Sequence, residues 1–223
     1  MTILPNQAAR KLFLIFLAFD LLFIGVHLIL VSIHSDESGR LTGVLYGRLN
    51  ISSDRAAPEF FNYAKWLAAA ILSFVGYSRS GEKAFWGFGF ASVMFLADDA
   101  LQLHERIGQV FASIGVSRLF ILDAATQGEL AGLAILGLLV AGAMLFAWRT
   151  SNGEFRSTIK VLIISIFGMI LCGVVFDVVH GLVEGTFGSG FYATVTGVLE
   201  DGGELIFISL YTATVYSAVK SRV

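Results

Sequence analysis

Long apolar segments constrain this sequence more than any other feature. A helix of about 20 apolar residues is long enough to cross the hydrocarbon core of a bilayer. Inside hydrocarbon each backbone amide needs a partner within its own segment, so a single spanning segment of this kind has to be helical. The pattern predicts an all-α protein, a polytopic transmembrane helix bundle of about six helices forming one transmembrane domain over residues 1–223. The predicted spans are about 12–33, 62–79, 84–106, 128–148, 158–184 and 194–218.

The composition supports this interpretation and excludes several other classes of protein. Hydrophobic residues make up 56% of the chain and charged residues only 14%, which is typical of multi-pass membrane proteins. A net charge of −2 provides no basic surface for a nucleic acid. The single cysteine, Cys172, lies in an apolar run, so neither a disulfide framework nor a cysteine zinc motif is expected. We therefore expect the lipid bilayer as the main partner and no nucleic acid.

The basic residues predict how the spans are oriented. Cytoplasmic loops of membrane proteins carry an excess of lysine and arginine. With the amino terminus inside, nine basic residues fall on inner segments and five on outer segments, which favours two cytoplasmic termini. The inner residues are Arg10, Lys11, Arg79, Lys83, Arg149, Arg156, Lys160, Lys220 and Arg222, and the outer residues are Arg40, Arg48, Arg55, Arg106 and Arg118.

Acidic and histidine residues interrupt four of the predicted spans, and this orientation places all of them in the outer half of the bilayer. An ionised side chain at that depth costs about 2.5 to 3.5 kcal/mol on insertion scales, so such residues point to a functional site. Asp98 and Glu105, and likewise Asp177 and Glu184, are spaced by two helical turns and share a helix face. The candidate site residues are His27, Asp98, Asp99, His104, Glu105, Asp177, His180, Glu184, Glu200, Asp201 and Glu204.

The segment 174–209 reads as a hairpin of two membrane helices joined by a Gly-rich turn. Asp177 lies twelve residues before the turn centre at Ser189 and Asp201 lies twelve residues after it. In an antiparallel helix pair these positions share one depth, because each residue adds about 1.5 Å of rise. The hairpin is therefore predicted to bring the acids of the last two spans together.

Carboxylates crowded in a medium of low dielectric constant cannot all ionise unless protons or a cation accompany them. Oxygen and imidazole ligands without a thiolate suit zinc, iron or manganese. The D-x-x-H spacing of Asp177 and His180 also has the i, i+3 geometry of carboxylate metal sites in helical bundles. A divalent metal is therefore predicted at this cluster, with the catalytic residues unspecified. The sequence has no haem attachment motif, nucleotide-binding loop or nucleophile motif.

Other roles are open for several of these residues. Asp98 or Asp99 could pair with Arg106 or Lys65, and His180 could be a packing histidine bonded to a carbonyl group. Small residues in the fourth predicted span favour close helix packing, and these are Gly128, Gly132, Gly137 and Gly142. Some ionisable residues could instead be solvated at the water interface, and these are His104, Glu105, Glu129 and Glu184.

Two stretches, APEFFNYAKWLAAAIL and FWGFGFASVMFLADDALQLHERIG, resemble a group of uncharacterised bacterial multi-pass membrane proteins. In that group an acidic pair and a His-Glu end helix three, and a second acidic pair recurs near the start of a late helix. Asp98-Asp99 stands here where the group usually has Asp-Glu. The resemblance covers about half of the chain. It implies a bacterial inner-membrane protein with a shared polar centre, and it implies no activity.

Three functions are compatible with this sequence. The first is an intramembrane metal-dependent enzyme, a hydrolase or oxidoreductase acting on a lipid or another small apolar substrate. The second is a proton- or cation-coupled transporter or channel, in which the same carboxylates bind and release the ion. The third is an accessory or sensory subunit of a membrane complex, with an oligomer or a partner subunit possible.

Overall fold

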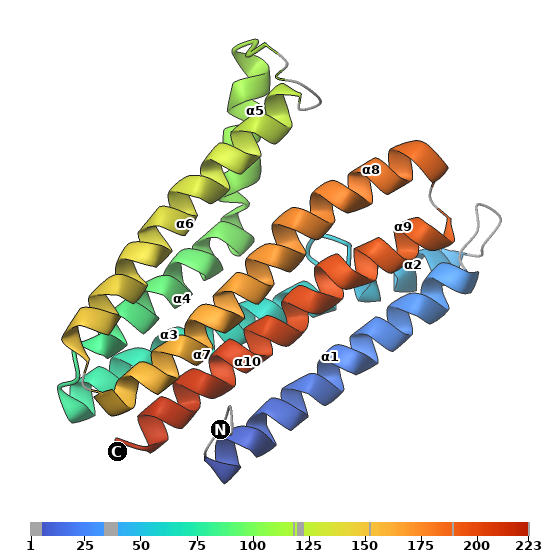
Figure 1. Ribbon diagram of the computed structural model, residues 1–223. Coiled ribbons are helices and arrows are strands. Elements are labelled where there is room, and N and C mark those ends of the chain that lie inside the picture. The colour runs from blue at the N-terminus through green and yellow to red at the C-terminus, as the bar shows by residue number, and fades with distance from the viewer. Residues whose placement is uncertain are drawn as a thin grey trace. The chain divides into compact units, whose positions relative to one another are not determined.

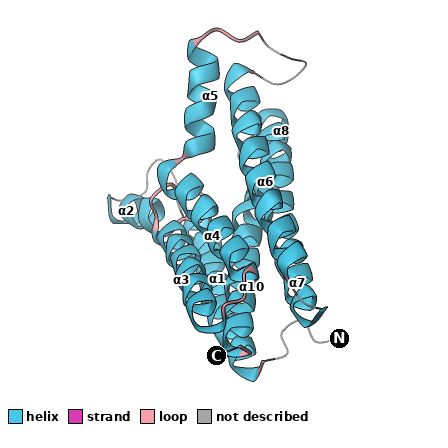
Figure 2. Ribbon diagram, turned by 90° about the vertical axis from the view of Figure 1, so that its left-hand side faces the viewer, coloured by secondary structure: helices cyan, strands magenta, loops and turns pink. Residues whose placement is uncertain are grey.

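The computed structural model describes residues 6–33, 40–117, 119, 123–151, 153–188 and 190–222. These residues form helices and contain no β-strand, which confirms the all-α prediction (Figures 1 and 2). The chain divides into two compact units, and the boundaries fall inside α3 and α7. Unit 1 comprises the chain up to Lys65 together with Lys160–Ser221, and unit 2 comprises Trp66–Ile159 and the last two residues. The predicted single transmembrane domain stays a prediction.

In unit 1 the long first helix α1 (Gln7–Ile33) packs against the last helix α10 (Gly203–Lys220), as the blue and red ribbons of Figure 1 show. The predicted hairpin is present, because α8 and α9 lie against each other. The other elements of unit 1 are α2 (Arg40–Leu49), the start of α3 (Ala57–Ser80), the end of α7 (Gly153–Ile170), the π-helical segment η1 (Leu171–Phe176), α8 (Asp177–Phe187), α9 (Phe191–Gly197) and the π-helical segment η2 (Val198–Gly202).

In unit 2 the helix α6 (Ala124–Thr150) packs against both α4 (Ala84–Leu101) and α5 (Leu103–Ser113). Glycines permit this close approach. A Cβ atom on Gly128 would lie 2.7 Å from the Cα of Gly108, and one on Gly132 would lie 2.9 Å from the Cα of His104. The predicted packing role is thus confirmed for these two glycines. At Gly137 and Gly142 an added Cβ would meet no atom of the described residues within 4 Å, so a packing role there stays a prediction.

The predicted span 84–106 is not one continuous helix. Gln102 adopts a left-handed backbone conformation, with φ 50° and ψ 49°, and it separates α4 from α5. A non-glycine residue in this region interrupts the α-helical hydrogen bonds. Asp98 supports the break, because its Oδ1 atom accepts a hydrogen bond of 3.1 Å from the backbone N–H of His104. Hydropathy alone did not reveal this interruption.

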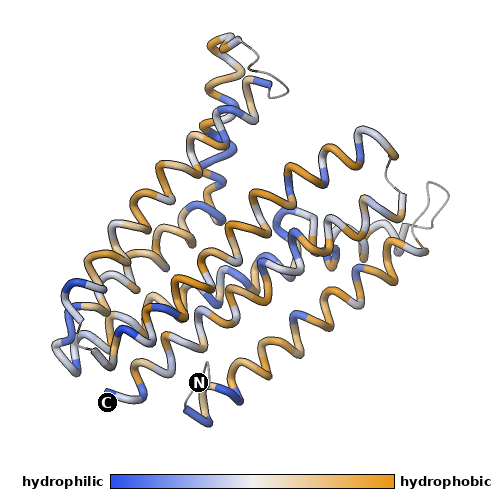
Figure 3. The backbone as a smooth tube through the Cα atoms, in the orientation of Figure 1, coloured by the Kyte–Doolittle hydropathy of each residue, from blue (hydrophilic) through white to orange (hydrophobic). Residues whose placement is uncertain are grey.

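Four helices in the described part of the chain are long and apolar enough to cross a membrane. Large apolar side chains also point outward, since Leu138 is 75% exposed and Phe167 is 67% exposed. Figure 3 shows hydrophobic residues along most of α1 and α6. These features indicate a multi-pass membrane protein. The four helices are Gln7–Ile33, Ala84–Leu101, Ala124–Thr150 and Phe155–Phe187, the last of which combines α7, η1 and α8. The other two predicted spans, 62–79 and 194–218, are helical in the structure but do not belong to this set.

Candidate functional site

Two π-helical segments face each other in unit 1, and both lie next to acidic residues. Asp177 directly follows η1, while Glu200 and Asp201 lie within η2. Gly173 lets η1 approach the start of α10, because the carboxyl group of Glu204 lies against this glycine. A π-helical turn carries one extra residue within its hydrogen-bonded ring, and such turns occur frequently at functional sites.

His180 and Glu200 form the central contact of the hairpin. The Nδ1 atom of His180 lies 2.8 Å from the Oε2 atom of Glu200, and the two side chains are 26% and 18% exposed. The imidazole ring lies next to Gly197, where an added Cβ would be 3.2 Å from its Cε1 atom. The contact lies two residues from the register expected from the turn, since His180 precedes Ser189 by nine residues and Glu200 follows it by eleven. His180 is therefore bonded to a carboxylate and not to a backbone carbonyl group.

Asp201 and His27 contact a loop that sequence reasoning did not connect with the site. Ser52, in the connection between α2 and α3, donates a hydrogen bond through its Oγ atom to Asp201. Asn50 lies 2.7 Å from the Nδ1 atom of His27 and accepts a 2.9 Å hydrogen bond from the backbone N–H of Ser52. Nothing in the local sequence marks Asn50 and Ser52, because polar residues are ordinary in a loop.

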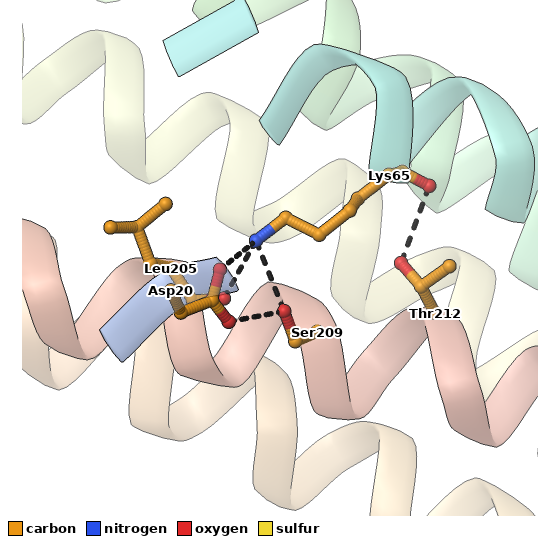
Figure 4. A network of polar contacts seen from close by, with 5 residues as sticks. All are labelled: Asp20, Lys65, Leu205, Ser209 and Thr212. Atoms are coloured by element: carbon orange, nitrogen blue, oxygen red, sulfur yellow. Dashed lines mark hydrogen bonds and ion pairs between the residues drawn. The ribbon is translucent and has the colours of Figure 1, made fainter. Parts of the chain in front are cut away.

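A buried ion pair in unit 1 was also missed (Figure 4). The Nζ atom of Lys65 donates hydrogen bonds to Asp20 Oδ1 at 3.0 Å, to the carbonyl oxygen of Leu205 at 2.9 Å and to Ser209 Oγ at 3.1 Å. Ser209 in turn donates to Asp20 Oδ2 at 2.5 Å. The side chains of Lys65 and Asp20 are 1% and 0% exposed. Lys65, considered from the sequence as a partner of Asp98 or Asp99, is thus bound to Asp20.

In unit 2 the acidic pair at the end of α4 has two different partners. Asp98 Oδ2 lies 2.9 Å from His104 Nδ1, so one carboxylate bonds both the backbone and the side chain of His104. Asp99 accepts a 3.1 Å hydrogen bond from the indole N–H of Trp66. Two neighbouring residues of a helix point about 100° apart, which explains why they do not share a partner. Asp98 therefore has a structural role at the helix break.

The protonation of His104 provides a direct test of this contact. His104 lies beyond the end of the candidate span Ala84–Leu101, and the hydrogen bond that its imidazole donates to the Asp98 carboxylate raises the pKa of the imidazole more than burial lowers it. We expect NMR titration of the protein in detergent to give a His104 pKa above that of a free histidine. Asp98→Asn should lower this pKa, because the amide removes the charge that favours the imidazolium. An unchanged pKa in Asp98→Asn would contradict the assignment.

The remaining candidates lie at more exposed positions. Glu105 accepts a 3.2 Å hydrogen bond from Gln102, and Asp177 and Glu184 are exposed. Among the described residues, no group of three or more His, Cys, Asp or Glu side chains could hold a metal ion. The contacts of His180 and His104 are pairs of an imidazole with one carboxylate, which do not fit the ligand number of a resident zinc, iron or manganese. The divalent metal stays a prediction. So does a single centre shared by all of the candidate residues.

Comparison with known proteins identifies a family. The family described as a domain of unknown function (DUF8692) matches residues 54–218, which is more than half of the chain. The chain belongs to the DUF8692 family. This confirms the expected membership of an uncharacterised family, while the bacterial origin and the recurring acidic pair stay predictions. No curated protein and no solved structure matches the chain. Family membership therefore brings no activity with it, and the function has to be argued from the geometry.

Proposed function

We propose that this protein is a multi-pass membrane protein of the inner membrane, with both termini in the cytoplasm, whose C-terminal hairpin binds and releases a proton or a small cation. The observation that carries the proposal is the contact between His180 and Glu200, where α8 meets η2. An imidazole and a carboxylate 2.8 Å apart are a pair that can gain or lose one proton without breaking their hydrogen bond.

The surroundings of this pair support transfer and not only storage of a charge. Both side chains are about a fifth to a quarter exposed, so a proton can reach them. Two further carboxylates border the pair of His180 and Glu200. Asp177 directly follows η1, and Asp201, next to Glu200, accepts a hydrogen bond from the Ser52 hydroxyl. Ionisable groups on membrane helices are expensive and commonly mark ion or proton pathways. The hairpin has several of them on adjacent turns.

The metal-dependent enzyme is less well supported by the same contacts. A catalytic zinc site has three protein ligands and an open position, whereas His180 is paired with one carboxylate. A proton needs no such ligand set, because one imidazole and one carboxylate are enough to hold it. We therefore favour ion or proton translocation over hydrolysis or oxidation of a lipid substrate.

Proton flux in liposomes tests the proposal. Purified protein is reconstituted into vesicles containing a pH-sensitive dye, with valinomycin and potassium to fix the membrane potential. We expect the internal pH to relax faster than in protein-free vesicles. Glu200→Gln should slow this relaxation on the order of tenfold or more, because a positioned proton-transfer group is lost. Glu184→Gln is the matched control, since Glu184 is an exposed glutamate on the same hairpin.

Two results would count against this function. Wild-type vesicles that relax no faster than protein-free vesicles would exclude proton translocation. Stoichiometric zinc, iron or manganese in the purified protein, lost on His180→Ala, would favour the metal-dependent enzyme instead.

A further inference from the structure

The oxygen atoms around the ammonium group of Lys65 have the composition of a cation site. Asp20 contributes a carboxylate, Ser209 a hydroxyl group and Leu205 a backbone carbonyl group, at 2.9 to 3.1 Å from Nζ (Figure 4). We infer that these groups form a binding site for a monovalent cation of ammonium size, and that the Lys65 ammonium is its internal occupant. The inference adds a second site and names its ion. The site itself is argued independently, and only a role for it in transport rests on the proposed function.

The ligand set points to a monovalent cation. It contains one carboxylate with two neutral oxygen donors, so the site has a single negative charge when Asp20 is ionised. Carbonyl and hydroxyl oxygens replace the hydration shell of potassium in membrane proteins. Potassium and ammonium have similar ionic radii, so a cage at hydrogen-bonding distance from an ammonium nitrogen also suits potassium. The ring of Phe61, with its centroid 4.7 Å from Nζ, adds a further favourable contact for a cation.

Two hydrogen bonds that do not involve the Lys65 ammonium group also hold this cage. Ser209 donates to Asp20 Oδ2, which joins α10 to α1. Thr212 donates a 3.3 Å hydrogen bond to the backbone carbonyl oxygen of Lys65, which joins α10 to α3. Both contacts stay available when the Lys65 side chain is shortened. The oxygen ligands are therefore expected to keep their positions.

Burial makes the cage depend on a positive charge. Asp20 is 0% exposed, and a buried carboxylate without a partner is strongly unfavourable. If the Lys65 ammonium leaves Asp20, a proton or another cation has to take its place. An external cation and the Lys65 ammonium therefore compete for the same oxygen atoms, which provides a means of exchanging one for the other.

Lys65→Met tests the inference. Methionine has a side chain about as long as the lysine stem up to Cε, with sulfur in place of Cδ, and it has no Nζ atom, so the place of the ammonium group becomes vacant. We expect potassium chloride to raise the melting temperature of Lys65→Met by about 5 °C over choline chloride at equal ionic strength. Ammonium should act like potassium, and lithium should act less. Wild-type protein should show no difference between the salts.

The double variant Asp20→Asn/Lys65→Met is the control, because it lacks the charge that holds the cation and should lose the response. Lys65→Gln is a second variant, used if Lys65→Met does not fold in choline, because its shorter side chain also leaves the place of Nζ vacant and ends in a polar amide. Folding of either variant in potassium alone supports the site. The inference is overturned if Lys65→Met is equally stable in potassium and choline, or if the double variant responds to potassium as strongly as Lys65→Met. It is also overturned if neither Lys65→Met nor Lys65→Gln folds in either salt. Proton flux in wild-type vesicles is measured separately, so the failure of one proposal is distinguishable from the failure of the other.

Discussion

Asp20→Ala is expected to destabilise the folded protein by about 3 to 5 kcal/mol, the cost typical of removing one partner from a buried ion pair. Lys65 would then have an ammonium group that is 1% exposed, with the neutral oxygens of Leu205 and Ser209 as its remaining hydrogen-bond partners among the described residues. Ser209 would also lose its acceptor on Asp20. Because the hydroxyl bonds both members of the pair, the substitution disturbs three elements of unit 1 at once, α1, α3 and α10.

The free energy of unfolding, measured in detergent with increasing denaturant, gives the size of this effect. Asp20→Leu/Lys65→Met is the informative comparison, since replacing both charges by apolar groups of similar size is often nearly neutral. Glu184→Gln, at an exposed position, should change stability by no more than about 0.5 kcal/mol. If the single and the double variants lose the same stability, the ion pair is not what holds these helices together.

The helices were largely predictable from the sequence, because apolar runs of spanning length leave a chain few alternatives in a bilayer. The break at Gln102 was not predictable. It depends on the bonds that Asp98 makes to the backbone and ring of His104, and a pattern of hydropathy does not contain such bonds. The π-helical segments η1 and η2 also give no signal in the sequence, since they continue the α-helices on either side.

The candidate site was predictable where chain connectivity determines distance. A short turn sets the register of a hairpin, and His180 and Glu200 are in contact at positions close to those the turn predicts. The pair of Asp20 and Lys65 joins segments 45 residues apart, and its geometry depends on how two helices rotate and pack. A signal for it was nevertheless present. The predicted span 12–33 contains Asp20 as its only acidic residue, and 62–79 contains Lys65 within its first turn, so two isolated opposite charges needed partners.

Gly128→Leu is expected to destabilise the protein by about 3 kcal/mol, near the upper end of the range for overpacking. Gly128 lies where α6 meets α5, and a Cβ atom there would lie 2.7 Å from both the Cα of Gly108 and the carbonyl oxygen of Ile107. These are backbone atoms, which cannot rotate away as the end of a side chain can. The helices would have to separate, and the contacts along their length would be lost.

Gly137→Leu is the matched control, because it makes the same change on the same helix where an added Cβ meets nothing within 4 Å. Leucine favours a helix by about 0.5 to 1 kcal/mol over glycine, so Gly137→Leu should leave the protein as stable as the wild type or more stable. Thermal unfolding of the two variants in one detergent measures the difference directly. Equal melting temperatures would show that α5 and α6 do not pack closely at Gly128. A lower melting temperature in Gly128→Leu alone would establish that backbone contact, and not hydropathy alone, holds these two helices together.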